Sequence, residues 1–180
     1  MSTDFDYLQT LADDFISIPR IRQAFALIER QEISGWEVWF QIEFSQFLSN
    51  HESEPEWWRE STVDYDRRME KEKVQCRPDF LIRKKHWALD RYAALEVKQH
   101  PQAGHCIKNM VADLRKMSKV RASSVDLRSY WVLGIHRDES EDEIARLIDQ
   151  HVTNQGAVVV HGLVASRRIE GTGLAYTLFG

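Results

Sequence analysis

The chain has 180 residues, of which 43% are hydrophobic and six are tryptophan. This composition excludes a disordered chain and predicts one packed domain over residues 1–180. No apolar run approaches the ~18 residues that cross a bilayer, and the first residues lack the basic and apolar regions of a conventional secretory signal. Two cysteines are too few for a disulfide framework. We therefore expect a cytoplasmic protein in a reducing compartment, with no membrane partner.

The net charge of −4 conceals a strong segregation of charge along the chain. Residues 77–137 carry 13 Lys and Arg against 5 Asp and Glu, whereas the remaining residues carry 11 against 23. Binding to phosphates without sequence preference depends on the local placement of Lys and Arg rather than on the total charge. The segregation favours a nucleic acid as partner, DNA ahead of RNA. For any single basic residue, an ordinary solvated helix face is the alternative.

Helices are predicted for the first part of the chain. Residues 4–18 have apolar residues at helical spacing, and Pro19 ends this helix and suits the first turn of the next, over residues 20–30. Gly35 interrupts the pattern, and residues 36–48 predict a third, strongly aromatic helix.

One acidic residue of the third helix lies inside its apolar stripe. On a wheel of about 100° per residue, Glu43 falls within about 60° of Trp36, Phe40 and Phe47. A glutamate that faces a core needs a partner, because an unpaired buried charge is costly. That partner is either a metal ion at the edge of the sheet or a buried arginine or tyrosine. Glu37 lies about 100° round the helix and is the weaker candidate.

A charged segment then leads to a predicted β-hairpin. Residues 57–63 suggest a first strand within a polar insertion, and residues 74–83 and 92–98 have the alternation of two further strands. If the turn of this hairpin is centred near residues 87–88, antiparallel pairing brings Asp79 opposite Glu96.

The second strand of the hairpin carries the most informative side chains. Glu96 and Lys98 are two residues apart and share a face, whereas Val97 points into apolar packing. The carboxylates of Asp79 and Glu96 would repel each other unless a cation lies between them or one takes up a proton. Such oxygen ligands suit Mg²⁺ or Mn²⁺, and a neighbouring lysine can orient water or stabilise an anionic transition state. An exposed hairpin with a surface Glu/Lys pair is the alternative.

The segments after the hairpin predict a helix, a strand, a helix and two strands. Residues 103–120 form an amphipathic helix. Residues 127–135 form a strand, Ser140 begins a capped helix, and residues 157–164 and 174–179 form strands.

Several polar residues near this amphipathic helix are candidates for contacts with phosphates: Gln99, Lys108, Arg115 and Lys116. For Gln99, an amide at the end of a strand is an equally good interpretation. A zinc site at His100, His105 and Cys106 is set aside, because no fourth ligand stands at a suitable spacing.

The pattern of Pro78 and Asp79 on one strand, with Glu96 and Lys98 on the next, resembles the PD-(D/E)XK nuclease superfamily. The resemblance implies an α/β fold with a restriction-endonuclease-like αβββαβ core over about residues 36–136. In this fold a mixed sheet is flanked by helices, and here extra N-terminal helices and C-terminal strands would be added to it.

The resemblance also implies the activity of a magnesium-dependent endonuclease. Asp79, Glu96 and the backbone carbonyl of Val97 would bind one or two Mg²⁺ or Mn²⁺ ions, and Glu43 would complete the metal site from the preceding helix. Lys98 would orient or deprotonate the attacking water or neutralise charge on the phosphate. Roles in restriction, repair, mobile-element processing or as a bacterial antagonistic toxin are all compatible with these residues. A dimer is compatible with them as well.

Two other functions fit the same sequence. One is a catalytically inactive module of the same fold that binds nucleic acid or a protein partner. The other is an adaptor that uses the tryptophan-rich segment around Trp57 and Trp58.

Overall fold

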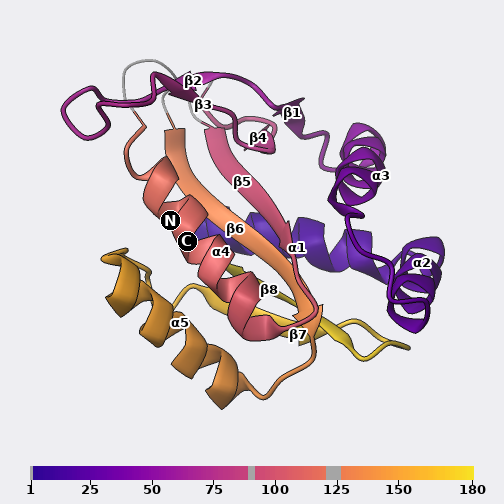
Figure 1. The fold of residues 1–180 in the computed structure, drawn as a ribbon. Coiled ribbons are helices and arrows are strands. Elements are labelled where there is room, and N and C mark those ends of the chain that lie inside the picture. The colour runs from indigo at the N-terminus through magenta and orange to yellow at the C-terminus, as the bar shows by residue number, and fades with distance from the viewer. Residues whose placement is uncertain (1, 89–91, 121–126) are drawn as a thin grey trace.

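The computed structural model describes residues 2–88, 92–120 and 127–180 (Figure 1). Three helices come first, as the sequence predicts: α1 (Ser2–Ser17), α2 (Pro19–Arg30) and α3 (Glu37–Asn50). Pro19 occupies the first turn of α2, where a missing backbone N–H costs nothing because that donor has no partner within the helix. No helix in the described ranges has both the length and the apolar character to span a bilayer.

The centre of the molecule is a mixed six-stranded sheet with the order β1-β4-β5-β6-β8-β7. Strands β5 and β6 pair in parallel, and the other four neighbouring pairs are antiparallel. The predicted mixed sheet is therefore confirmed. Its strands are β1 (Glu56–Arg59), β4 (Phe80–Arg83), β5 (Tyr92–Gln99), β6 (Leu127–Arg137), β7 (Val164–Arg168) and β8 (Leu174–Phe179).

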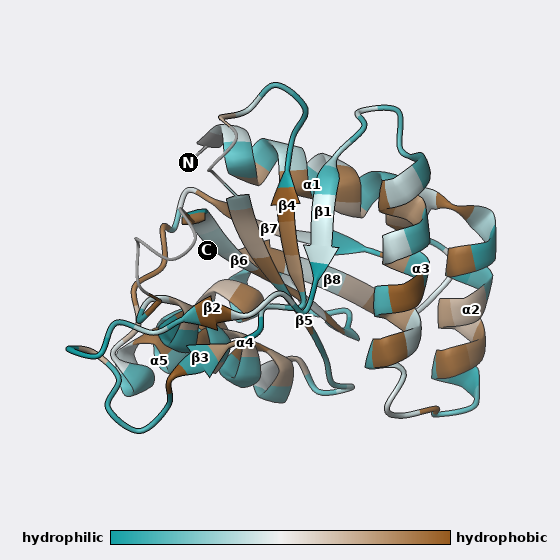
Figure 2. Ribbon diagram, turned by 90° about the horizontal axis from the view of Figure 1, so that it is seen from above, coloured by the Kyte–Doolittle hydropathy of each residue, from teal (hydrophilic) through white to brown (hydrophobic). Residues whose placement is uncertain are grey.

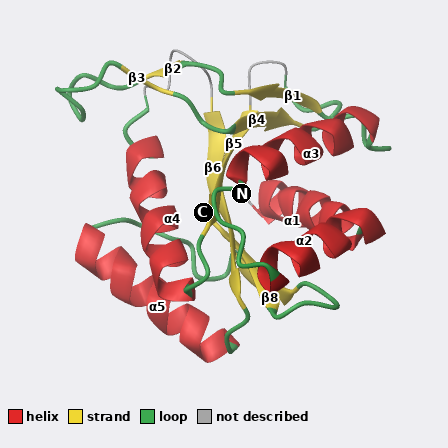
Figure 3. Ribbon diagram, turned by 45° about the vertical axis from the view of Figure 1, so that its right-hand side comes forward, coloured by secondary structure: helices red, strands yellow, loops and turns green. Residues whose placement is uncertain are grey.

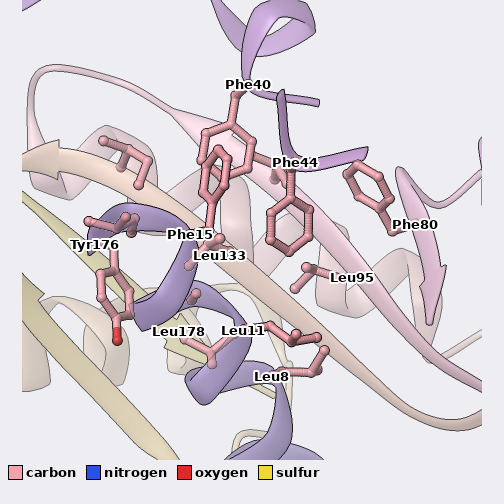
Figure 4. Close-up of a cluster of buried hydrophobic side chains, with 14 of the residues drawn as sticks. Leu8, Leu11, Phe15, Phe40, Phe44, Phe80, Leu95, Leu133, Tyr176 and Leu178 are labelled. Atoms are coloured by element: carbon pink, nitrogen blue, oxygen red, sulfur yellow. The ribbon is translucent and has the colours of Figure 1, made fainter. Parts of the chain in front are cut away.

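Helices cover both faces of this sheet (Figure 3). On one face α1, α2 and α3 form an aromatic core with the sheet, in which Phe15, Phe40, Phe44 and Phe80 meet largely edge to face (Figure 4). Helices α4 (Ala103–Met117) and α5 (Glu141–Gln155) build a second core on the other face. Burial of each such large apolar side chain contributes about 1.5–3 kcal/mol, so both layers hold the sheet in place.

The first strands of the sheet differ in exposure. All four side chains of β4 are buried, whereas β1 lies at the edge of the sheet and is mostly exposed. Figure 2 shows the same contrast, with β4 hydrophobic and β1 pale or hydrophilic.

Residues 74–83 do not form the single strand that their alternation predicts. Two short strands, β2 (Val63–Asp64) and β3 (Gln75–Cys76), make a separate two-stranded sheet, and β4 begins only at Phe80. Pro78 lies between the two segments. Because proline has no N–H to donate to a ladder, it suits a break between strands better than the interior of one.

The prediction of a strand over residues 157–164 is wrong. Helix α5 ends before Gly156, whose φ of 62° is a left-handed helix cap, and β7 begins only at Val164. Val158 between them is 86% exposed. The valines of this run therefore lie in the connection between α5 and β7. A short apolar run does not by itself specify a strand. At the other end of α5 the predicted cap is present, since the backbone N–H of Glu143 donates to Ser140 Oγ over 3.2 Å.

Candidate functional site

The pairing of β4 with β5 places the sequence-predicted residues at one end of the hairpin. Phe80 pairs with Leu95 and Ile82 with Ala93, so the next position in this register sets Asp79 opposite Glu96. Strand β5 continues to Gln99, beyond the start of β4. The last residues of β5 thus extend past their antiparallel neighbour, and the candidate site lies where that neighbour stops.

The side chain of Asp79 takes the place of the missing β4 backbone beside the last residues of β5. Its Oδ2 accepts a hydrogen bond from the backbone N–H of Val97 at 2.7 Å, and its Oδ1 accepts one from Gln41 Nε2 at 2.8 Å. Arg59 Nε in turn donates to Gln41 Oε1 at 3.1 Å. A backbone amide and two side chains from α3 and β1 therefore hold the Asp79 carboxyl group in one orientation.

Glu96 lies directly beside Asp79, and their carboxyl groups share a hydrogen bond. The Glu96 side chain is only 14% exposed. Burial, followed by the negative charges of Asp79 and Asp113, raises the pKa of Glu96 to about 8. Burial also raises the pKa of Asp79, although the Val97 amide and the Lys98 ammonium oppose this. Near neutral pH, Glu96 therefore holds the proton that lets two adjacent carboxyl groups coexist.

The ammonium group of Lys98 is surrounded by oxygen atoms. They are the carbonyl oxygen of Val97 at 3.0 Å, Asp113 Oδ2 at 3.0 Å, Glu96 Oε2 at 3.6 Å and Glu37 Oε1 at 3.7 Å. Burial lowers the pKa of Lys98, but the charges of Asp113 and Glu96 outweigh it and leave the pKa raised. Lys98 is therefore a fixed cation inside an oxygen-lined site.

Asp113 on α4 is the member of this site that the sequence analysis missed. Its side chain is 8% exposed and pairs with both Lys98 and Lys116. A signal was available, because Asp113 lies three residues after Met110 and four before Met117, within the buried stripe of α4. The argument that singled out Glu43 on the third helix applies equally to Asp113.

The structure does not bring Glu43 to Asp79 and Glu96. Glu43 forms an ion pair with Arg20 of α2, so its partner is an arginine as in the alternative interpretation, but the pair is exposed rather than buried. The buried side of α3 includes Phe40, Gln41, Phe44 and Leu48, so the helix is rotated from the predicted stripe. As a result Gln41 and Glu37, rather than Glu43, face the end of β5.

The predicted nucleic-acid-binding residues are dispersed. Lys116 joins the site through its ion pair with Asp113. Lys108 and Arg115 are exposed on α4, and Lys108 lines a separate hollow together with His105. Gln99 directly follows Lys98 on β5 but points to the opposite face of the sheet.

The donor set suits a hard divalent cation. Asp79, Glu96 and the Val97 carbonyl supply oxygen atoms, which Mg²⁺ and Mn²⁺ prefer, and the Lys98 ammonium shows that this position accommodates positive charge. Within the described residues, however, no three Asp, Glu, His or Cys side chains are grouped so as to hold a metal ion. Two carboxyl groups and one carbonyl are thus the set on which a metal site would depend.

Comparison with known proteins adds no relative: no family model matches the chain, and no curated protein or solved structure shows a significant similarity to it. The interpretation of the site therefore depends on its own residues and geometry.

Proposed function

We propose that this chain is a metal-dependent nuclease that hydrolyses phosphodiester bonds, with DNA as the preferred substrate. The observation that carries the proposal is the convergence of Asp79, Glu96 and Lys98 at the end of β5. The order α3, β1, β4, β5, α4, β6 also agrees with the αβββαβ order that the resemblance to the PD-(D/E)XK superfamily implies, with the small β2–β3 sheet as an insertion.

Asp79, Glu96 and the carbonyl of Val97 would hold the metal. When bound, Mg²⁺ or Mn²⁺ would polarise the scissile phosphate and lower the pKa of a coordinated water. Of the two acidic residues of α3, Glu37 is the better candidate for a supporting role, because it approaches Lys98 whereas Glu43 pairs with Arg20.

The surroundings of Lys98 favour one of its two proposed roles. A general base must be neutral, yet the carboxylates around Lys98 raise its pKa and keep it charged. A fixed cation is suited instead to stabilising the negative charge that develops on the phosphate in the transition state. Asp113 is then a positioning residue, since it holds the ammonium from the α4 side at 3.0 Å.

Plasmid cleavage in Mg²⁺ or Mn²⁺ tests this proposal. Removal of a single group that stabilises a transition state costs about 10²–10³-fold in rate. Lys98→Ala and Asp79→Ala should therefore lose at least that much while remaining folded, and Arg146→Ala, whose side chain on α5 is 60% exposed, should cleave normally. Full activity in the Asp79→Ala protein would reject the assignment.

A module that binds nucleic acid without cutting it is the second candidate. It is favoured by the position of the Lys98 ammonium, which already neutralises the carboxylates in the place of a metal ion. Calorimetry with Mn²⁺ separates the two functions. A nuclease should bind Mn²⁺ and release a proton near neutral pH, because Glu96 must lose its proton to act as a ligand. An inactive module should give no binding heat.

A further inference from the structure

A cavity of about 300 Å³ lies next to the candidate site. It is bounded by the end of α2, the segment between α2 and α3, and the ends of β5 and β6. Two of its lining residues adjoin the site in sequence: Trp36 precedes Glu37, and Gln99 follows Lys98. Its volume is at the lower end of the ~300–1,000 Å³ range of ligand pockets. The cavity therefore suits one small ligand beside Asp79, Glu96 and Lys98.

The walls of this cavity are held in place by the fold. Both carboxylate oxygens of Glu29 accept hydrogen bonds from the backbone N–H of Gly173, at 2.9 and 3.1 Å, which ties the end of α2 to the turn before β8. The segment after α2 turns sharply, with a positive φ at Glu32 (50°) and at Gly35 (72°). Because Glu32 is not a glycine, its left-handed conformation has a conformational cost. The Glu29 hydrogen bonds and this turn therefore fix the position of two of the segments that line the cavity.

The lining of this cavity combines apolar and polar side chains. Trp36, Ile28 and Leu174 provide apolar surface, and Ile33 in the α2–α3 segment is 44% exposed although it is a large apolar residue. Gln99 also lines the cavity, and its amide makes no hydrogen bond or ion pair to another described side chain.

Charged side chains at the cavity argue against a phosphate as its occupant. Glu29 and Glu32 both line it, together with Arg137 and His100. Two carboxylates repel a phosphate, whereas they accept hydrogen bonds from the amino and imino groups of a nucleobase. A cavity whose lining combines apolar side chains with hydrogen-bond donors and acceptors suits a base, which presents apolar faces and a polar edge.

We propose that this cavity receives one unpaired nucleobase of the substrate strand, next to the phosphodiester that lies at Asp79, Glu96 and Lys98. The proposal rests on the nuclease function proposed above. Gln99 is one residue, ~3.3 Å, beyond Lys98 along β5, and their side chains point to opposite faces. For a strand whose phosphate lies at Lys98 to reach the cavity, its base has to turn round the end of β5 and leave its stack.

The position of the cavity defines the class of substrate. Extracting a base from a duplex costs a few kcal/mol, and less for a mismatched or single-stranded base. Single-stranded, frayed or mismatched DNA is therefore the preferred substrate, and fully paired DNA is the poorer one.

Binding of a fluorescently labelled single-stranded oligonucleotide to the full chain in EDTA, followed by anisotropy, tests the cavity without cleavage. Ile28→Trp fills the cavity, and Leu27→Trp is the matched control, because Leu27 is the neighbouring residue of α2 but is 45% exposed and outside the cavity. Loss of one base contact, worth about 1–3 kcal/mol, should weaken binding about tenfold in Ile28→Trp. Leu27→Trp should stay within about twofold of the wild type, because it removes no base contact.

A second measurement locates the base directly. An oligonucleotide that carries 5-iodouracil should crosslink under ultraviolet light to Trp36 or His100 in the wild type, and Ile28→Trp should abolish that crosslink. If Ile28→Trp fails to fold, Ile33→Ala replaces it, with Val38→Ala as the control, since Val38 is a 56% exposed residue outside the cavity. Ile33→Ala should then weaken binding several-fold.

The outcomes distinguish the two proposals. Metal-dependent cleavage with unchanged binding in the cavity variants, or with crosslinks elsewhere, would overturn the cavity and leave the nuclease. A crosslink at Trp36 without cleavage in Mg²⁺ or Mn²⁺ would overturn the nuclease and leave the cavity. Failure of the wild type to bind single-stranded DNA would overturn the cavity, and the plasmid assay would then decide the nuclease separately.

Discussion

Helices α3 and α4 each carry a carboxylate at a position where the helical wheel is apolar, but the two carboxylates have different surroundings. Asp113 on α4 is 8% exposed and contacts the Lys98 ammonium at 3.0 Å. Glu43 on α3 is 20% exposed and pairs with Arg20, whose own side chain is 51% exposed. The stripe shows that a helix buries a face. What that face meets depends on the neighbouring element, which is the charged end of β5 for Asp113 and helix α2 for Glu43.

The largest contrast between these two residues should appear in stability. Asp113→Ala removes the nearest acidic partner of a mostly buried lysine, a change that typically costs about 3 kcal/mol or more. Glu43→Ala breaks an exposed pair and should cost no more than about 1 kcal/mol. Urea unfolding of both variants measures the difference.

A double variant controls for the charge of Lys98. Combining Asp113→Leu with Lys98→Met removes both members of the pair and should recover part of the lost stability, because the unpaired ammonium is gone, although Asp79 and Glu96 lose their nearby cation. Equal losses in Asp113→Ala and Glu43→Ala would mean that burial of the carboxylate does not determine its contribution.

The pH dependence of stability should sharpen the same contrast. The pKa of Glu96 is raised by burial to about 8 in the folded state, from about 4.3 in the unfolded chain. Between these values the folded state binds the extra proton, so the free energy of unfolding falls as pH rises from about 5 to 8. We expect a decrease of about 2 kcal/mol, smaller than the full shift because Asp79 shares the titration.

Glu96→Gln should flatten this slope, since glutamine keeps the hydrogen-bonding shape without the ionisation. Glu43→Gln is the matched change on α3 and should keep the slope of the wild type. Thermal unfolding at pH 5, 6.5 and 8 gives the comparison, and an unchanged slope in Glu96→Gln would place the titrating group elsewhere.

The smallest expected effect concerns Glu37, the acidic residue that α3 contributes to the site. Glu37 lies 3.7 Å from Lys98, with an exposed side-chain fraction of 36%. Glu37→Gln should therefore slow metal-dependent cleavage about tenfold, the equivalent of about 1.4 kcal/mol, whereas Glu43→Gln should cleave like the wild type. Initial rates at saturating Mn²⁺ test this pair. Loss of activity in Glu43→Gln alone would restore the role that the sequence first suggested for Glu43.

Much of the site could be predicted because it lies on a hairpin. A strand alternates faces with period two, so the shared face of Glu96 and Lys98 is a local property of the chain. The turn near residues 87–88 then brings Asp79 opposite Glu96, and the observed pairing of Phe80 with Leu95 agrees. For the same local reason, the capping residue of α5 could be predicted from the sequence.

The elements that were predicted incorrectly depend on distant contacts. Residues 74–83 break into two strands because β3 pairs with β2 rather than continuing into β4. Residues 157–163 connect α5 to β7, where Val159 is buried but Val158 and Val160 are exposed, and they make no strand. Composition and period describe a segment but not the partner with which it pairs.

By itself, the sequence determined the mixed α/β class, the three N-terminal helices and the register that brings Asp79, Glu96 and Lys98 together. Only the tertiary structure decided that Asp113 and Glu37, not Glu43, approach the lysine, and that a cavity opens beside it. The physical reason is one of range. Pairing across a short turn is set by a few neighbouring residues, whereas the rotation of a helix against a sheet is set by side chains that are far apart in the chain.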